Sequence, residues 1–148
     1  MKSSTLLCKT INTTSVQGIS VGLLILRVGL SFSMIYLHGY PKLVNFSEFS
    51  NGFADPLGVG SGVSLGFVIF AEFFCSIFLT IGLFVRLSSI SLITTMIVAT
   101  WIINGGKDFI FQEKSFIYLI AYISLLLGGG GRYSIDYLIK RNTDRSQR

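Results

Sequence analysis

The sequence predicts an all-α membrane protein, a polytopic antiparallel bundle of four transmembrane helices. Four long apolar stretches occupy most of its 148 residues. A helix needs about 20 mostly apolar residues to cross the hydrocarbon core of a bilayer, and lipid admits only segments that satisfy their own backbone hydrogen bonds. Charged residues make up 13% of the chain, against about 25% in soluble domains, so little sequence is left for a soluble domain.

The chain divides into three parts. Residues 1–17 form a polar segment, residues 18–133 hold the four spans, and residues 134–148 form a short amphipathic helix with a basic tail. The spans are expected at about 19–38, 63–85, 87–104 and 115–131. Gly39 and Pro41 predict the end of the first span. The second and third spans, separated only near Arg86, predict a hairpin.

The longest connection follows the first span. It carries aromatic residues at helical spacing, Phe46, Phe49 and Phe53. This pattern predicts a short helix at the membrane interface, where aromatic side chains lie at the depth of the headgroups.

Basic residues predict the orientation. With both chain ends in the cytoplasm, eight Lys and Arg residues lie inside and three outside. The eight are Lys2, Lys9, Arg86, Arg132, Lys140, Arg141, Arg145 and Arg148, and the three are Lys42, Lys107 and Lys114. Because cytoplasmic loops carry an excess of Lys and Arg, this bias predicts that both termini are cytoplasmic.

Several classes of protein are disfavoured. No domain remains to bind a nucleic acid, a nucleotide or a haem. The two cysteines, Cys8 and Cys75, do not form a C-x-x-C pair, which a dithiol redox enzyme requires. One histidine, His38, cannot supply bis-histidine haem ligation or a metal cluster. We therefore expect no metal and no covalently bound cofactor.

Two ionisable residues interrupt the spans, Arg27 in the first and Glu72 in the second. A charge inside the membrane is expensive, so such a residue marks a functional site by default. Two interpretations stay open. Arg27 and Glu72 form a buried salt bridge that holds the two spans in register, or they lie in a polar pocket where Glu72 moves protons or binds a ligand. Intramembrane charges usually pair, which favours the salt bridge.

Helical spacing places polar residues on one face of several spans. Lipid cannot satisfy such faces, so they should point into the bundle. The predicted polar pocket contains Arg27, His38, Glu72, Tyr118 and Tyr122. His38 lies where the first span meets the outer interface, and it is either a polar cap or a group that handles protons or binds a quinol, since imidazole titrates near neutral pH.

Charged residues at the ends of the spans have structural interpretations. Arg86 and Asp136 are predicted to pair and to tie the turn between the second and third spans to the C-terminal helix. Lys42 is expected at headgroup depth. Arg132 is placed to bind a lipid phosphate.

Taken in order, these residues resemble the DoxX family of small bacterial membrane proteins. The resemblance rests on Arg27, on His38-Gly39-x-x-Lys42, on Glu72, and on two motifs at the ends of spans: Gly82-Leu83-Phe84-Val85-Arg86 and Gly131-Arg132-Tyr133-Ser134-x-Asp136. It extends from about Leu23 to Ile139. Many relatives carry a histidine near the end of the third span, where this chain has Ile103-Asn104.

The resemblance implies a four-helix bundle in the bacterial inner membrane. The family takes its name from a subunit associated with quinol oxidase and thiosulfate:quinone oxidoreduction, and some members are linked to redox homeostasis through membrane-bound partners. The small size, the absence of cofactor motifs and the lack of a catalytic set favour a non-catalytic accessory subunit that anchors or stabilises a larger membrane complex. The alternative, which the family name and the polar faces favour, is a quinone-linked redox component with a pocket inside the bundle. Expected partners are lipid and other membrane subunits, and quinone is the candidate ligand.

The orientation can be tested by labelling single cysteines in intact cells. A cysteine at Gln147 should resist an impermeant thiol reagent, and one at Asn51 should react with it, because the Lys and Arg bias places the first inside and the second outside. The background is a variant in which Cys8 and Cys75 are serine. Labelling at Gln147 with protection at Asn51 would reverse the orientation.

Overall fold

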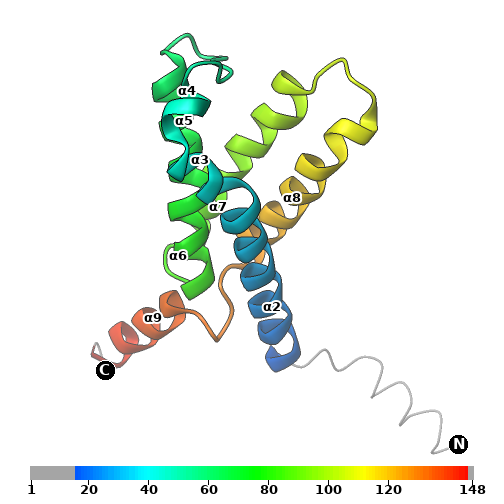
Figure 1. Cartoon of the computed structure of the whole chain (residues 1–148). Helices are drawn as coiled ribbons and strands as arrows, with labels where there is room; N and C mark the ends of the chain where they lie inside the picture. Colours follow the sequence, from blue (N-terminus) through cyan, green and yellow to red (C-terminus); the bar gives the residue numbers. More distant parts are fainter. Residues whose placement is uncertain (1–15, 147–148) are drawn as a thin grey trace, which may run out of the picture.

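The computed structural model of this chain describes residues 16–146, and these are helices joined by turns. Four helices are long and apolar enough to cross a membrane: Val16–Val44, Ser61–Ile81, Val85–Ile103 and Phe109–Gly128. The prediction of an all-α, four-span protein is confirmed. Most of the predicted N-terminal segment lies outside the described residues. Figure 1 shows that the chain enters the first span and leaves the last one at the same end of the bundle.

The first span extends beyond its predicted end. It runs through α2 (Val16–Met34), the π-helix η1 (Ile35–Gly39) and α3 (Tyr40–Val44). Pro41 does not stop it, because the wide π-turn comes directly before it and Pro41 falls in the first turn of α3, where no backbone N–H is needed. The backbone N–H of Tyr40 donates to the carbonyl of Ile35 across this turn.

Gly39 marks a close approach of the first two spans. A Cβ atom at this position would lie 2.9 Å from the backbone carbonyl group of Glu72 and from the nitrogen of Phe73. Gly39 therefore lets the backbone of η1 pack directly on that of η2 (Phe70–Cys75). The residue predicted to end a helix is instead a packing contact between two helices.

The second span consists of α5 (Ser61–Ile69), η2 and α6 (Ser76–Ile81), and the third of α7 (Val85–Ile97) and η3 (Val98–Ile103). Gly82 ends α6 with a φ of 75°. The N–H of Gly82 donates to the carbonyl of Leu79 at 3.1 Å, and that of Leu83 to the carbonyl of Phe78 at 2.9 Å. These two bonds form a Schellman motif, so the predicted hairpin turns on a glycine in the left-handed conformation.

The connection after the first span contains the predicted short helix, α4 (Phe46–Ser50). Asp55 then organises the turn into α5. Its carboxylate accepts hydrogen bonds from the Ser64 hydroxyl and the Gly60 N–H, both at 2.6 Å, and from the Val59 N–H at 3.2 Å. These bonds, with that from Ser64 first, lower the pKa of Asp55 below its ordinary value, because they favour the charged carboxylate.

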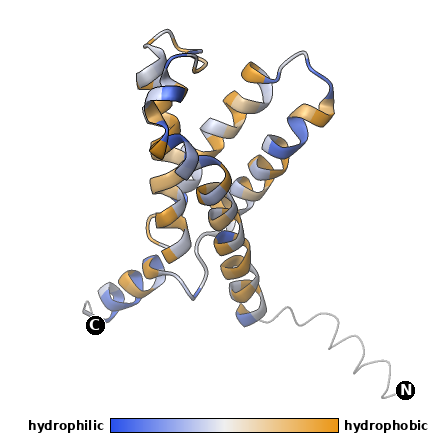
Figure 2. Ribbon diagram, in the orientation of Figure 1, coloured by the Kyte–Doolittle hydropathy of each residue, from blue (hydrophilic) through white to orange (hydrophobic). Residues whose placement is uncertain are grey.

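The fourth span, α8 (Phe109–Gly128), begins earlier than predicted and is followed by α9 (Ile135–Ser146). The predicted amphipathic helix is present, and α9 extends it through most of the predicted basic tail to Ser146. None of the residues of α9 is buried. Figure 2 shows hydrophobic colours along the spans and alternating hydrophilic and hydrophobic bands on α9.

All four spans contribute to one core. Its buried members are Met34, Cys75, Leu79, Val85, Leu92, Met96, Leu119, Tyr122 and Leu125. The third and fourth spans are also joined by a hydrogen bond of 2.8 Å, which the Thr100 hydroxyl of η3 donates to the Ser115 hydroxyl of α8. The core contains few side chains from each span, so many of the apolar side chains of the spans face outward.

Replacing Gly39 with alanine should lower the free energy of unfolding by about 1–3 kcal/mol, because the added methyl group meets backbone that cannot move aside. The measurement is thermal or denaturant unfolding in detergent. Gly22→Ala is the matched control, since a Cβ at that helical glycine meets nothing within 4 Å. Equal stability of Gly39→Ala and Gly22→Ala would contradict the close approach of η1 and η2.

Candidate functional site

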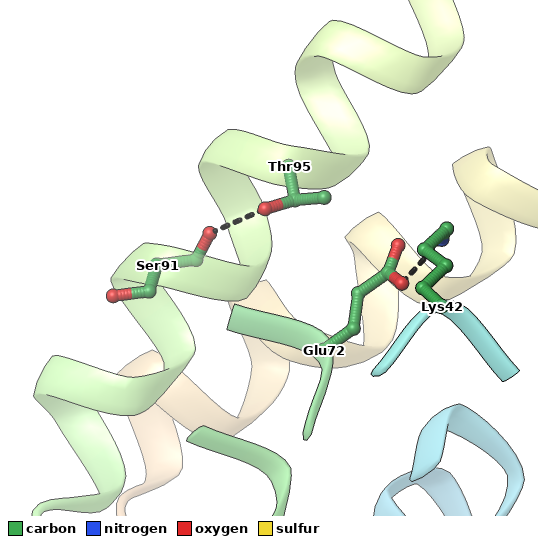
Figure 3. A network of polar contacts seen from close by, with 4 residues as sticks. All are labelled: Lys42, Glu72, Ser91 and Thr95. Carbon is green, nitrogen blue, oxygen red and sulfur yellow. Dashed lines mark hydrogen bonds and ion pairs between the residues drawn. The ribbon is translucent and has the colours of Figure 1, made fainter. Parts of the chain in front are cut away.

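Polar residues gather at two levels of the bundle. The level nearer the Phe46–Ser50 helix is centred on Glu72 of η2, whose side chain is 6% exposed. Its carboxylate forms an ion pair with the ammonium of Lys42 on α3. Figure 3 shows the two side chains facing one another beside α7, where the Thr95 hydroxyl donates to the carbonyl of Ser91. The charge of Glu72 is thus met by the first span.

The predicted pairing of Glu72 with Arg27 is therefore wrong, whereas the predicted headgroup depth of Lys42, two residues before the end of the first span, stays a prediction. Lys42 reaches Glu72 because the first span stays helical past Pro41. Arg27 instead lies against Gly82, and Glu72 is about 15 Å from Gly82 along the second span at 1.5 Å per residue. An arginine side chain does not cover that distance while it also contacts Gly82.

Aromatic residues extend the level of Glu72. The rings of His38 and Tyr118 meet edge to face with centroids 6.1 Å apart, and those of Tyr118 and Tyr122 stack at 6.0 Å. The Tyr118 hydroxyl shares a hydrogen bond with that of Ser33. Tyr122 is fully buried, and Glu72 acts on it electrostatically. We call His38, Lys42, Glu72, Tyr118 and Tyr122 the loop-side cluster.

Arg27 belongs to the second level, at the end of the bundle that carries α9. Its guanidinium donates from Nη2 to the backbone carbonyl of Tyr133. A Cβ atom on Gly82 would lie 1.9 Å from Nη1, so only glycine at this turn leaves room for the guanidinium. Asp136 is the acidic group that acts electrostatically on Arg27.

Asp136 ties this level together. Its carboxylate accepts hydrogen bonds from the backbone N–H groups of Phe84 at 2.8 Å and Val85 at 2.9 Å, and its own N–H donates to the carbonyl of Gly82 at 3.0 Å. A carboxylate at the start of α7 also complements the helix dipole. We call Arg27, Gly82, Tyr133 and Asp136 the tail-side cluster.

The predicted tie between the hairpin turn and the C-terminal helix is present, but its chemistry differs. Asp136 binds the backbone of the turn, and among the described residues it forms no ion pair with Arg86. The left-handed Phe84, with a φ of 50°, presents two consecutive N–H groups to one carboxylate. A backbone conformation of this kind cannot be read from charge spacing.

Six buried polar atoms, three of them in the two clusters, lack a hydrogen-bond partner among the described residues. They are Arg27 Nε and Nη1, Ser31 Oγ, Ser76 Oγ, Ser88 Oγ and Tyr122 Oη. All four spans contribute at least one. Buried polar groups are nearly always hydrogen-bonded to protein or water. These atoms are therefore available to water or to a small polar ligand.

The chemistry open to the clusters is binding and proton exchange. Glu72, His38 and the two tyrosines are titratable groups. Among the described residues, no group of three His, Cys, Asp or Glu side chains is placed to hold a metal ion. Arg132, predicted to bind lipid phosphate, is exposed next to the tail-side cluster. Of the predicted pocket, the structure brings together His38, Glu72, Tyr118 and Tyr122 and leaves Arg27 apart.

Sequence reasoning missed several contributors, namely Ser33, Lys42 as the partner of Glu72, Gly82 and the Tyr133 carbonyl. One signal was available. Lys42 lies four residues after His38, so it continues the face that carries Arg27, Ser31 and His38. Assigning a helix end to Gly39 and Pro41 concealed that continuation.

Four apolar spans that enclose charged residues define a small integral membrane protein. The DoxX family model matches residues 22–105 of the chain, which is more than half of its 148 residues. The chain therefore belongs to the DoxX family. The match includes Arg27, Lys42, Glu72 and Gly82 and ends before the fourth span, so the C-terminal motif with Asp136 lies outside it. No curated protein and no solved structure matches the chain.

A double-mutant cycle tests the loop-side ion pair. Lys42→Gln should destabilise the protein by about 3 kcal/mol, because it leaves a buried carboxylate without its partner. Adding Glu72→Gln should recover most of this loss, since no unpaired charge remains. The measurement is unfolding in detergent. Arg27→Gln is the control and should add to Glu72→Gln within about 0.5 kcal/mol. Strong coupling of Glu72 to Arg27, with none to Lys42, would contradict the structure.

Proposed function

We propose that this protein is a small accessory subunit of the bacterial inner membrane that anchors or stabilises a larger membrane complex. Both termini lie in the cytoplasm, and the protein is not catalytic by itself. One observation carries the proposal: Glu72 is paired within the chain by Lys42, whereas the spans leave many large apolar side chains exposed. In the fourth span only 17% of an 18-residue apolar stretch is buried.

The exposed surface of α8 illustrates the argument. Ile117, Ile120 and Leu127 are 56%, 51% and 75% exposed. Without water, helices associate through packing and interhelical hydrogen bonds rather than through the hydrophobic effect. An exposed apolar face on α8 fits a partner helix and requires no chemistry from this chain.

Photo-crosslinking in the native membrane tests the accessory role. A photoreactive residue at Ile120 should trap a membrane protein of defined mass, because this side chain faces away from the bundle. The same residue at Leu119, which is 5% exposed, is the control and should give only adducts within the chain. Mass spectrometry identifies the adducts. Adducts with lipid alone from Ile120, Ile117 and Leu127 would contradict a partner on α8.

A second candidate is a quinone-linked redox component. A specific observation favours it: the buried Tyr122 hydroxyl has no hydrogen-bond partner among the described residues, and its ring stacks on Tyr118, whose ring meets that of His38. A quinone ring can accept hydrogen bonds from such hydroxyls and exchange a proton with a nearby titratable group. Here His38, at the edge of the stack, is the group best placed for that exchange.

His38→Ala separates the two candidates. In a deletion strain complemented with this variant, a quinone-linked role predicts loss of quinol-dependent respiration with normal recovery of the partner complex. An accessory role predicts that respiration changes only as far as partner recovery changes. Both quantities are measured in the same membranes, together with bound quinones. Normal respiration and normal recovery would exclude His38 from either mechanism.

A further inference from the structure

A groove lies at the end of the bundle where α2 begins. It is formed by the start of α2, the turn from α8 to α9, and α9, and its volume is about 400 Å³. Its lining includes Ile19 and Leu23 of α2, Arg132 of the turn and Lys140 of α9. Gly131 lets the turn lie against α2, because a Cβ there would be 3.3 Å from the Cα of Ser20.

The polarity of the groove changes with depth. Arg132 and Lys140 are exposed, and within the described part of the chain their side chains have no ion-pair or hydrogen-bond partner. Ile19 and Leu23 lie along α2, where the span enters the hydrocarbon. Two cations at the surface and apolar side chains at depth match an amphiphile with an anionic head.

Asp136, the acidic residue of the groove, does not neutralise these cations. Its carboxylate is taken up by the N–H groups of Phe84 and Val85. The side chains of Arg132 and Lys140 are therefore available to an external anion.

The orientation of α9 fits the same setting. Figure 1 shows α9 separated from α8 by a turn and extending outward from the end of the bundle below α6. Leu138 and Ile139 are 52% and 53% exposed on it, whereas Lys140, Arg141, Asp144 and Arg145 share another face with Tyr137. A helix with these two faces lies in the plane of a membrane interface.

We propose that this groove binds one anionic phospholipid, with its phosphate between Arg132 and Lys140 and an acyl chain along Ile19 and Leu23. The proposal is independent of the accessory or redox role. It requires only that this end of the bundle lies at a membrane surface. The groove then holds the head of a lipid against the residues that follow α8.

Thermal unfolding of the full-length protein in detergent tests the proposal, with lipid added to the micelles. Phosphatidylglycerol should raise the melting temperature, and phosphatidylcholine should raise it much less. Arg132→Gln/Lys140→Gln should weaken the apparent affinity for phosphatidylglycerol about tenfold. Both replaced side chains are exposed, so the melting temperature without lipid should stay unchanged.

The matched control removes the same charge from another face. Arg141→Gln/Arg145→Gln also deletes two cations from the same end of the protein, but these residues lie outside the groove. It should retain most of the affinity. Equal losses in the two double variants would show a diffuse electrostatic effect and would overturn the site.

Two further arms identify the ligand. Soluble glycerol phosphate should not reproduce the shift, because it lacks an acyl chain, and an equal shift would assign the groove to a free phosphate. Ile19→Ser should weaken phosphatidylglycerol, and an unchanged affinity would overturn the acyl contact. Native mass spectrometry should retain one phosphatidylglycerol per chain, and retention of none would overturn the proposal.

Discussion

The rest of the structure depends on the need to satisfy the Glu72 carboxylate inside the membrane. A charge there must find a partner in the protein, and Lys42 is that partner. Lys42 reaches it only because the first span continues as a helix through Pro41, which a π-turn makes compatible with the backbone. Gly39 then brings the backbone of this turn against Glu72 itself. One ion pair thus requires the π-turn, the glycine and the long first span together.

The tail-side cluster meets the same constraint with different chemistry. The Arg27 guanidinium donates a hydrogen bond to the backbone carbonyl of Tyr133. The carboxylate of Asp136, on α9, attracts it electrostatically. Asp136 in turn binds the N–H groups that α7 leaves unpaired at its start. The residues after the fourth span are consequently part of the bundle's hydrogen bonding, although the family match ends before them.

The fold was predictable from the sequence because span length and apolar composition are direct consequences of the bilayer. The helical faces were also predictable, and they placed His38, Glu72, Tyr118 and Tyr122 in one cluster. The pairing of charges was not. It depends on whether Gly39 and Pro41 end a helix, and only the packing of η1 on η2 decides that. Likewise, the bond from Asp136 to the turn depends on the left-handed Phe84, which side-chain charge does not reveal.

The two clusters differ in how closely they are connected to the surface of the protein. The loop-side cluster is closed by its own ion pair and by the stack of aromatic rings, so a change there must break internal contacts. The tail-side cluster is continuous with the surface, since Arg132 directly precedes the Tyr133 carbonyl that accepts the hydrogen bond from Arg27. Anything that binds Arg132 therefore acts one residue from the hydrogen bond that joins the Arg27 guanidinium to the Tyr133 carbonyl. Since Nε and Nη1 of Arg27 are unsatisfied, the tail-side cluster is the place where the membrane surface can influence the interior of the bundle.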